Sequence, residues 1–250
     1  MLVPARVEEL TYFALFILII GLTILRARMI REIPPVRRIA GLEALEEAVG
    51  RATEMGRPVF LVPGAGDVTD SSAVDTLAGL AILERTAELC AEYDARLIVT
   101  ITRPNVYPIA HEIVRQASVK KARPNLLRPD TVQFLSEDQF AWSMGTVALM
   151  HSEKVASAIL VGLFRAESLL LAEAAGQLNA ITIGGCARIV QIPYFIVACD
   201  YCLIGEELMV AGAYLSREPI QLGAVRGQDL SKILMALMIL AGSLAASFKK

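Results

Sequence analysis

Apolar residues fill one uninterrupted stretch near each end of the chain. The first, Leu10–Leu25, contains no charged residue, and neither does the second, Ile233–Phe248. An α-helix rises about 1.5 Å per residue, so each stretch covers most of a hydrocarbon core about 30 Å thick. Basic side chains at the ends, such as Arg26, can extend to the interface and close the gap. Both stretches are therefore predicted to be transmembrane helices.

Each stretch has an alternative interpretation. A cleaved signal peptide would end in a small-x-small site, whereas Arg26, Arg28 and Arg31 follow the first stretch at once, which favours a retained anchor. The second stretch could instead be an amphipathic helix that packs on the domain or lies on the bilayer. It has few polar residues, and Gly242 and Ala246 show the small-xxx-small spacing of closely packed membrane helices. The lipid bilayer is thus an expected partner.

Basic residues are concentrated just after the first stretch, between positions 26 and 38, with only Arg6 before it. The positive-inside rule therefore predicts a cell-membrane protein whose central part lies in the cytoplasm. In that reducing compartment, the four cysteines are expected to be free thiols. The formal net charge is −2 and the pI is about 5.8, which argues against a nucleic-acid partner, because such proteins need a basic face.

Between the two stretches, short apolar runs alternate with segments of helical periodicity. Strands are predicted at 59–62, 96–102, 131–135, 156–164 and 180–183, and helices at 42–52, 73–93, 107–120, 139–150, 167–178 and 206–216, with 193–198 either strand or helix start. Apolar strands without a period of two, alternating with helices, indicate a parallel sheet covered on both faces. The predicted fold is a Rossmann-like, doubly wound α/β domain over 39–228, between an N-terminal anchor segment over 1–38 and a C-terminal transmembrane helix over 229–250.

The stretch 155–215 is more apolar than the surface of a monomer ordinarily tolerates. Hydrophobic residues make up 55% of the whole chain and aromatic residues only 6%, so the excess is aliphatic. Unpaired apolar surface of this kind usually becomes a subunit interface, which predicts a homo-oligomer. The alternative is a large alanine-rich core.

One glycine-containing segment is a candidate ligand site. Residues 63–72 follow a predicted strand and open a predicted helix, where an open α/β sheet binds ligands and a helix N-terminus attracts anions. The segment matches neither G-x-G-x-x-G nor a P-loop, and its two aspartates would repel phosphate. Residues after later strands could converge on it and hold a nucleotide or another small acidic ligand. The candidate ligand-binding residues are Gly64, Gly66, Asp67, Thr69, Ser71, Ser72, Arg103, Gly184 and Gly185.

Other chemically suggestive residues form no recognisable constellation. Cys199 and Cys202 make one C-x-x-C without a second pair at zinc-site spacing. His111 and His151 fit no metalloprotease or hydrolase motif, and the adjacent Glu206-Glu207 pair does not share a helix face. No metal, cofactor or catalytic residue is therefore predicted.

Four segments carry a resemblance that covers about 39–240. They are Val62–Asp67, Leu170–Gly176, Ala180–Gly185 and Ala198–Glu207. In these the chain resembles an uncharacterised family of archaeal and bacterial membrane proteins, known only as a domain of unknown function. The resemblance implies membrane association and assigns no reaction, so it transfers no catalytic residue.

Two functions follow as expectations. The first is a non-enzymatic, membrane-anchored scaffold whose cytoplasmic α/β domains assemble into a homo-oligomer. The alternative is a membrane-bound enzyme or sensor that binds a nucleotide or similar anion at the Gly64–Ser72 loop. A pore or transporter is less favoured, because neither uncharged stretch contains an ionisable residue.

Overall fold

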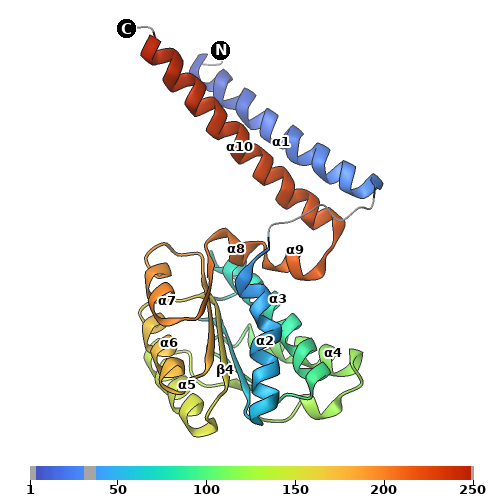
Figure 1. The fold of residues 1–250 in the computed structure, drawn as a ribbon, viewed down its shortest axis with the longest axis vertical. Coiled ribbons are helices and arrows are strands. Elements are labelled where there is room, and N and C mark those ends of the chain that lie inside the picture. The colour runs from blue at the N-terminus through green and yellow to red at the C-terminus, as the bar shows by residue number, and fades with distance from the viewer. Residues whose placement is uncertain (1–3, 31–37, 249–250) are drawn as a thin grey trace. The chain divides into compact units, whose positions relative to one another are not determined.

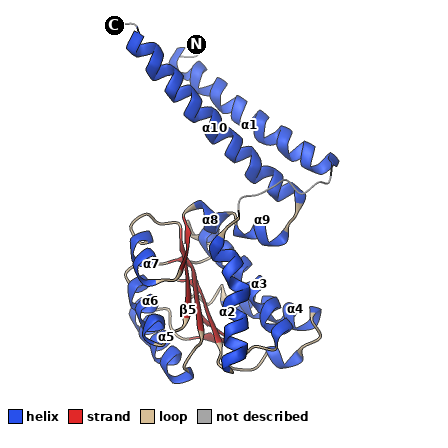
Figure 2. Ribbon diagram, viewed as in Figure 1, coloured by secondary structure: helices blue, strands red, loops and turns tan. Residues whose placement is uncertain are grey.

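The computed structural model describes residues 4–30 and 38–248, which fall into two compact units (Figure 1). One unit combines the two ends of the chain, Met1–Arg37 and Ser216–Lys250, and the other is Arg38–Leu215. The central unit is an α/β domain and the terminal unit is a pair of long helices (Figure 2).

The central unit is built on a six-stranded sheet in which every neighbouring pair is parallel. Its strands are β1 (Val59–Gly64), β2 (Leu97–Ile101), β3 (Val132–Phe134), β4 (Ser157–Leu163), β5 (Ile181–Cys186) and β6 (Tyr201–Ile204). The spatial order is β3-β2-β1-β4-β5-β6, so the direction of winding reverses between β1 and β4. This confirms the prediction of a doubly wound parallel sheet, and its strand order is that of the Rossmann fold.

Helices cover both faces of this sheet (Figure 1). One layer consists of α2 (Ala40–Met55), α3 (Ala73–Tyr93) and α4 (Tyr107–Lys120), and the other of α5 (Gln139–Glu153), α6 (Glu167–Gln177) and α7 (Ile192–Ala198). The remaining short helices are η1 (Pro124–Leu126), α8 (Glu206–Met209) and α9 (Ala211–Ser216).

Neighbouring residues of the central strands enter two separate hydrophobic clusters. In β1, Leu61 packs with α2 and α3, whereas Phe60 and Val62 pack with α5 and α6. β1, β2, β4 and β5 are buried along their whole length, because each has a neighbour on both sides and helices above and below. This explains why these strands appear in the sequence as continuous apolar runs.

Most predicted elements are confirmed, with small shifts at their ends. Residues 193–198 are helical, and the expected helix over 206–216 is divided into α8 and α9. The prediction lacks β6, a four-residue edge strand that pairs with β5. The prediction ended β5 at Ile183, whereas the strand continues through Gly184 and Gly185 to Cys186.

The terminal unit is an antiparallel pair formed by α1 (Pro4–Ile30) and α10 (Pro219–Phe248). Residues Leu10–Met29 and Pro219–Leu244 are long and apolar enough to cross a membrane, with mean hydropathies of 2.1 and 1.2. α10 begins at Pro219 rather than near 229, and its first half therefore contains charged residues that the uncharged stretch does not.

Small residues bring α1 and α10 together, but not those expected from the sequence. A Cβ atom on Gly223 would lie 2.7 Å from Cβ of Ala27, and one on Gly227 would lie 2.9 Å from Cα of Ile20. Gly242, the residue expected to make the close approach, would meet no atom within 4 Å. In this antiparallel register, the second half of α1 meets the first half of α10.

Candidate functional site

The loop Gly64–Ser72 leaves the sheet at the point where the winding reverses, at the carboxyl end of β1. Gly64 has a φ of +84°, and a Cβ atom there would lie 2.6 Å from the backbone N and O of Leu163 in β4. Ala65 N then donates to Leu163 O at 2.7 Å. Only a glycine allows the two backbones to approach this closely.

Four backbone N–H groups of this loop are already engaged by its own side chains. Asp67 Oδ1 accepts from Val68 N at 2.6 Å and from Thr69 N at 3.2 Å, and Asp70 Oδ1 accepts from Ser72 N at 2.7 Å. The Ser72 hydroxyl accepts from Asp67 N at 2.9 Å, while Ser71 is exposed. An anion on these N–H groups would have to displace both carboxylates.

Arginines from two other strand ends lie close to this loop. Arg103, after β2, donates from Nε to Ala65 O at 3.2 Å, so the structure brings this predicted residue to the loop. The hydrogen bonds from Ser72, and then the nearby charges of Arg103 and Arg165, lower the pKa of Asp70. Arg165 follows β4 and was not predicted, because nothing in the sequence distinguishes it from other surface arginines.

Asp75, in the first turn of α3, is a second carboxylate that the sequence did not single out. It is only 9% exposed, and its Oδ1 has no hydrogen-bond partner. Burial raises its pKa, while the charge of Arg188, which follows β5, acts in the opposite direction. The ends of β1, β2, β4 and β5 therefore gather acidic and basic groups, which we call the carboxyl-edge cluster: Asp67, Asp70, Asp75, Arg103, Arg165 and Arg188.

Two of the predicted ligand-binding residues are packed inside a strand and do not lie in a loop. Gly184 and Gly185 lie inside β5 and are buried. A Cβ atom on Gly184 would lie 2.8 Å from Sγ of Cys199 and collide with the ring of Phe195, and one on Gly185 would lie 3.1 Å from Cβ of Leu203. Their small size is needed for α7 and β6 to pack closely, so their role in ligand binding stays a prediction.

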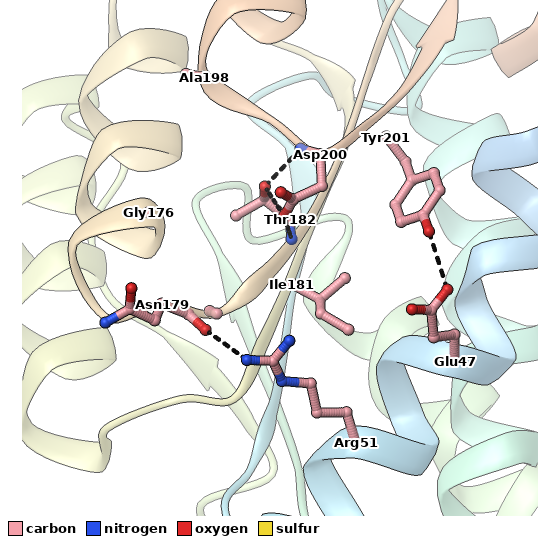
Figure 3. A pocket seen from close by; sticks show the side chains of 10 residues that line it. Glu47, Arg51, Gly176, Asn179, Ile181, Thr182, Ala198, Asp200 and Tyr201 are labelled. Carbon is pink, nitrogen blue, oxygen red and sulfur yellow. Dashed lines mark hydrogen bonds between the residues drawn. The ribbon is translucent and has the colours of Figure 1, made fainter.

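A cavity of about 560 Å³ lies at the opposite, amino edge of the sheet (Figure 3). Polar side chains of α2, β5 and β6 line it. Tyr201 donates its hydroxyl to Glu47 Oε2 at 2.9 Å, and Arg51 Nη2 donates to Asn179 O at 3.4 Å. Asp200 Oδ2 accepts from N and Oγ1 of Thr182, both at 2.8 Å.

The side chains that line this cavity can bind a polar ligand, but Tyr201 is not activated as a nucleophile. The hydrogen bond to Glu47 raises the pKa of Tyr201, so its hydroxyl remains protonated at neutral pH. Glu47, Arg51 and Asp200 are all exposed. An open site with one guanidinium and two carboxylates fits a small polar molecule that carries charges of both signs.

The cysteines and histidines of the chain are dispersed. All four cysteines are free thiols; Cys202 lies in β6 and Cys199 just before it. Burial raises the pKa of Cys199 to about 12, which keeps that sulfur protonated. Within the described ranges, no group of three or more His, Cys, Asp or Glu side chains is arranged to hold a metal ion.

A patch of exposed aliphatic side chains lies on and beside α7. Ile189 and Val197 are each 84% exposed, Val190 is 74% exposed and Ile196 is 52% exposed. The helix is held to the sheet by Phe195, whose ring packs edge to face against Phe164 at 5.3 Å between centroids. We call Ile189, Val190, Ile196 and Val197 the α7 patch.

Comparison with known proteins gives a family and no activity. The family model described as "Domain of unknown function (DUF6754)" matches residues 2–250. No curated protein and no solved structure matches the chain.

Proposed function

We propose that this chain, which belongs to the family described as Domain of unknown function (DUF6754), is a membrane-anchored scaffold whose α/β domains assemble into a homo-oligomer. The α7 patch is the observation that carries this proposal. Four aliphatic side chains exposed on one short segment cost free energy in water, and a monomer seldom leaves such a group uncovered.

The surroundings of the patch support a protein partner. Phe195 packs α7 against the sheet, so the backbone of this helix is already ordered. A partner that binds the α7 patch therefore need not pay for ordering the backbone of α7. Leu169 and Leu170 on α6, which packs beside α7, are also partly exposed. A second copy of the domain would supply a surface of the same kind, as a two-fold interface requires.

The two long terminal helices support membrane anchoring. Their length and hydropathy suffice for two spans, and the basic residues after α1 favour a cytoplasmic domain in a cell membrane. Both ends of the domain would then be tethered to the bilayer, which concentrates copies on one surface and promotes their association.

The test is the mass of the full chain in mild detergent, measured by light scattering with particle imaging. We expect a symmetric assembly for the natural protein and a smaller particle for Val197→Glu, because a carboxylate would be buried at the interface. Val119→Glu on α4 is the matched control: this valine is 68% exposed and lies on the opposite helix layer.

Two outcomes would contradict the proposal. The natural protein could be monomeric, or Val197→Glu could leave the mass unchanged. If the mass is unchanged while binding to lipid vesicles is lost, the α7 patch is a membrane contact instead.

The carboxyl-edge cluster favours a second candidate function, a small-ligand enzyme or sensor. Arginines that follow β2, β4 and β5 gather where a doubly wound sheet binds ligands, and the buried Oδ1 of Asp75 lacks a partner. Because four of the loop N–H groups are engaged, a ligand would be held mainly by the side chains of Arg103, Arg165 and Asp75.

A thermal-shift screen with nucleotides and other small anions tests this second candidate. A ligand that raises Tm should lose its effect in Arg165→Ala, whose side chain is exposed. Gly66→Val is unsuitable, because a Cβ atom there would lie 2.8 Å from the Ser72 hydroxyl and distort the loop itself. A screen without any shift would reject this function.

A further inference from the structure

The uncharged stretches of α1 and α10 overlap only in part, because the two helices are offset along their length. Gly223 lies against Ala27 and Thr23, and Gly227 lies against Thr23 and Ile20. Higher residue numbers in α10 therefore lie opposite lower residue numbers in α1, as in any antiparallel pair. In this register, at about 1.5 Å per residue, Asp229 and Lys232 lie level with the middle of the uncharged stretch Leu10–Leu25.

Three charged residues of α10 share one helix face at that level. Arg226, Asp229 and Lys232 are three residues apart, and all are exposed. We call them the α10 charge stripe. Lys232 Nζ pairs with Asp229 Oδ1 at 3.6 Å along the helix.

The stripe points away from α1. Asp229 lies two positions from Gly227, which at 3.6 residues per turn places it about 200° around the helix axis. Gly227 touches α1, and Ser231, also buried, donates its hydroxyl to Gly227 O at 2.8 Å. The hairpin therefore has a face packed on α1 and a charged face that α1 does not cover.

We propose that the α10 charge stripe is where a second copy of this chain packs inside the membrane. If α1 spans the bilayer, the stripe lies at hydrocarbon depth, where charged side chains almost always face protein and pair with one another. An identical copy with the same membrane orientation presents Arg226, Asp229 and Lys232 at the same depth.

The order of charges along the stripe fits such a neighbour. Asp229 lies about one helical turn from Arg226 on one side and from Lys232 on the other. The carboxylate of Asp229 in each copy can therefore accept a hydrogen bond from Arg226 of the other copy and keep its ion pair with Lys232 of its own helix. Gly223 and Gly227 are already used against α1, so a second contact at this depth must use another face. This inference rests on the proposed membrane-anchored homo-oligomer and adds a contact independent of the α7 patch.

The experiment co-expresses two differently tagged full chains in membranes and measures their co-purification in mild detergent. Asp229→Arg makes the stripe entirely cationic, and the double variant Arg226→Glu with Lys232→Glu makes it entirely acidic. We expect each variant to lose association with itself by at least about tenfold, and the cationic and acidic copies to associate with each other. Asp229→Glu keeps the carboxylate within the stripe and should change little.

The outcomes separate this inference from the proposed function. Unchanged self-association of Asp229→Arg overturns the stripe contact while leaving a homo-oligomer in place. Loss in both variants without recovery in the mixed pair also overturns it, and points to lipid headgroups as the partner. A natural protein that fails to associate with itself overturns both proposals.

Discussion

At the scale of single residues, the glycine at the end of β1 allows β1 to approach β4 closely where the winding of the sheet reverses. Gly64 combines a positive φ with a backbone contact to Leu163 that leaves no room for a Cβ atom. The same strand pair shifts its register between Val62 and Gly64. The geometry at the start of the Gly64–Ser72 loop therefore depends on the absence of a side chain.

Gly64→Ala should lower the free energy of unfolding by at least about 2 kcal/mol, because it adds backbone strain and a steric clash. Gly50→Ala is the control: Gly50 lies in α2, a Cβ atom there would meet no other atom within 4 Å, and alanine should add about 0.5 to 1 kcal/mol. Urea denaturation of the two variants measures both effects. Equal stabilities would refute the close approach.

At the scale of elements, the pair of α1 and α10 is organised by two glycines that lie one helical turn apart. Gly223 and Gly227 both face α1, whereas Gly242, with the same residue type on the same helix, faces open space. Residue type alone thus does not identify the contact, since the register of the two helices selects which small residues are used.

Gly227→Ile should separate the two helices, whereas Gly242→Ile should leave them together. Spin labels at Leu22 and Leu230, which are both exposed, supply the readout, because the distance between the labels reports the separation of the two helices. We expect this distance to lengthen in Gly227→Ile only. A similar distance in both variants would disprove the register.

The sequence was most informative where burial imposes a pattern. Apolar runs located β1 to β5 and most of the helices, because a parallel sheet covered on both faces leaves few polar positions. β6 escaped prediction because its segment was considered only for its C-x-x-C motif, although the similarly short edge strand β3 was found. The extension of α10 to Pro219 escaped because Arg226, Asp229 and Lys232 interrupt the hydropathy.

The candidate site was predicted less completely than the fold. Arg103 was placed at the Gly64–Ser72 loop from the rule that strand ends converge, and the structure puts it there. Asp75, Arg165 and Arg188 carried no motif, and only the folded chain brings them to one edge. Gly184 and Gly185 look like a turn in the sequence, but they lie within a strand.

At the scale of the whole molecule, the central unit contains all four cysteines and keeps each thiol more difficult to ionise than in an unfolded chain. Burial raises the pKa of Cys90, Cys186, Cys199 and Cys202. When the pKa of a thiol is higher in the folded than in the unfolded chain, its contribution to the free energy of unfolding is fully present below the unfolded-state pKa. That contribution is lost progressively as pH rises from the unfolded-state pKa to the folded-state pKa.

We therefore expect the free energy of unfolding to fall as pH rises above about 9, the ordinary thiol pKa, by up to about 1.4 kcal/mol per pH unit for each buried thiol. Urea titrations between pH 7 and 11 measure this slope. The double variant Cys90→Ala with Cys199→Ala should flatten it. An unaltered slope in that variant would assign the alkaline loss to other groups.

The pairing of α1 with α10 also dictates an order of events during synthesis. A ribosome makes the chain from its amino end, so α1 is made before the α/β domain and its partner α10 after it. Until then the α1 face that includes Ile20 and Ala27 has no Gly223 or Gly227 to pack against. The hairpin can therefore close only after the whole α/β domain has been translated, and a product terminated before Gly223 would leave that face of α1 uncovered.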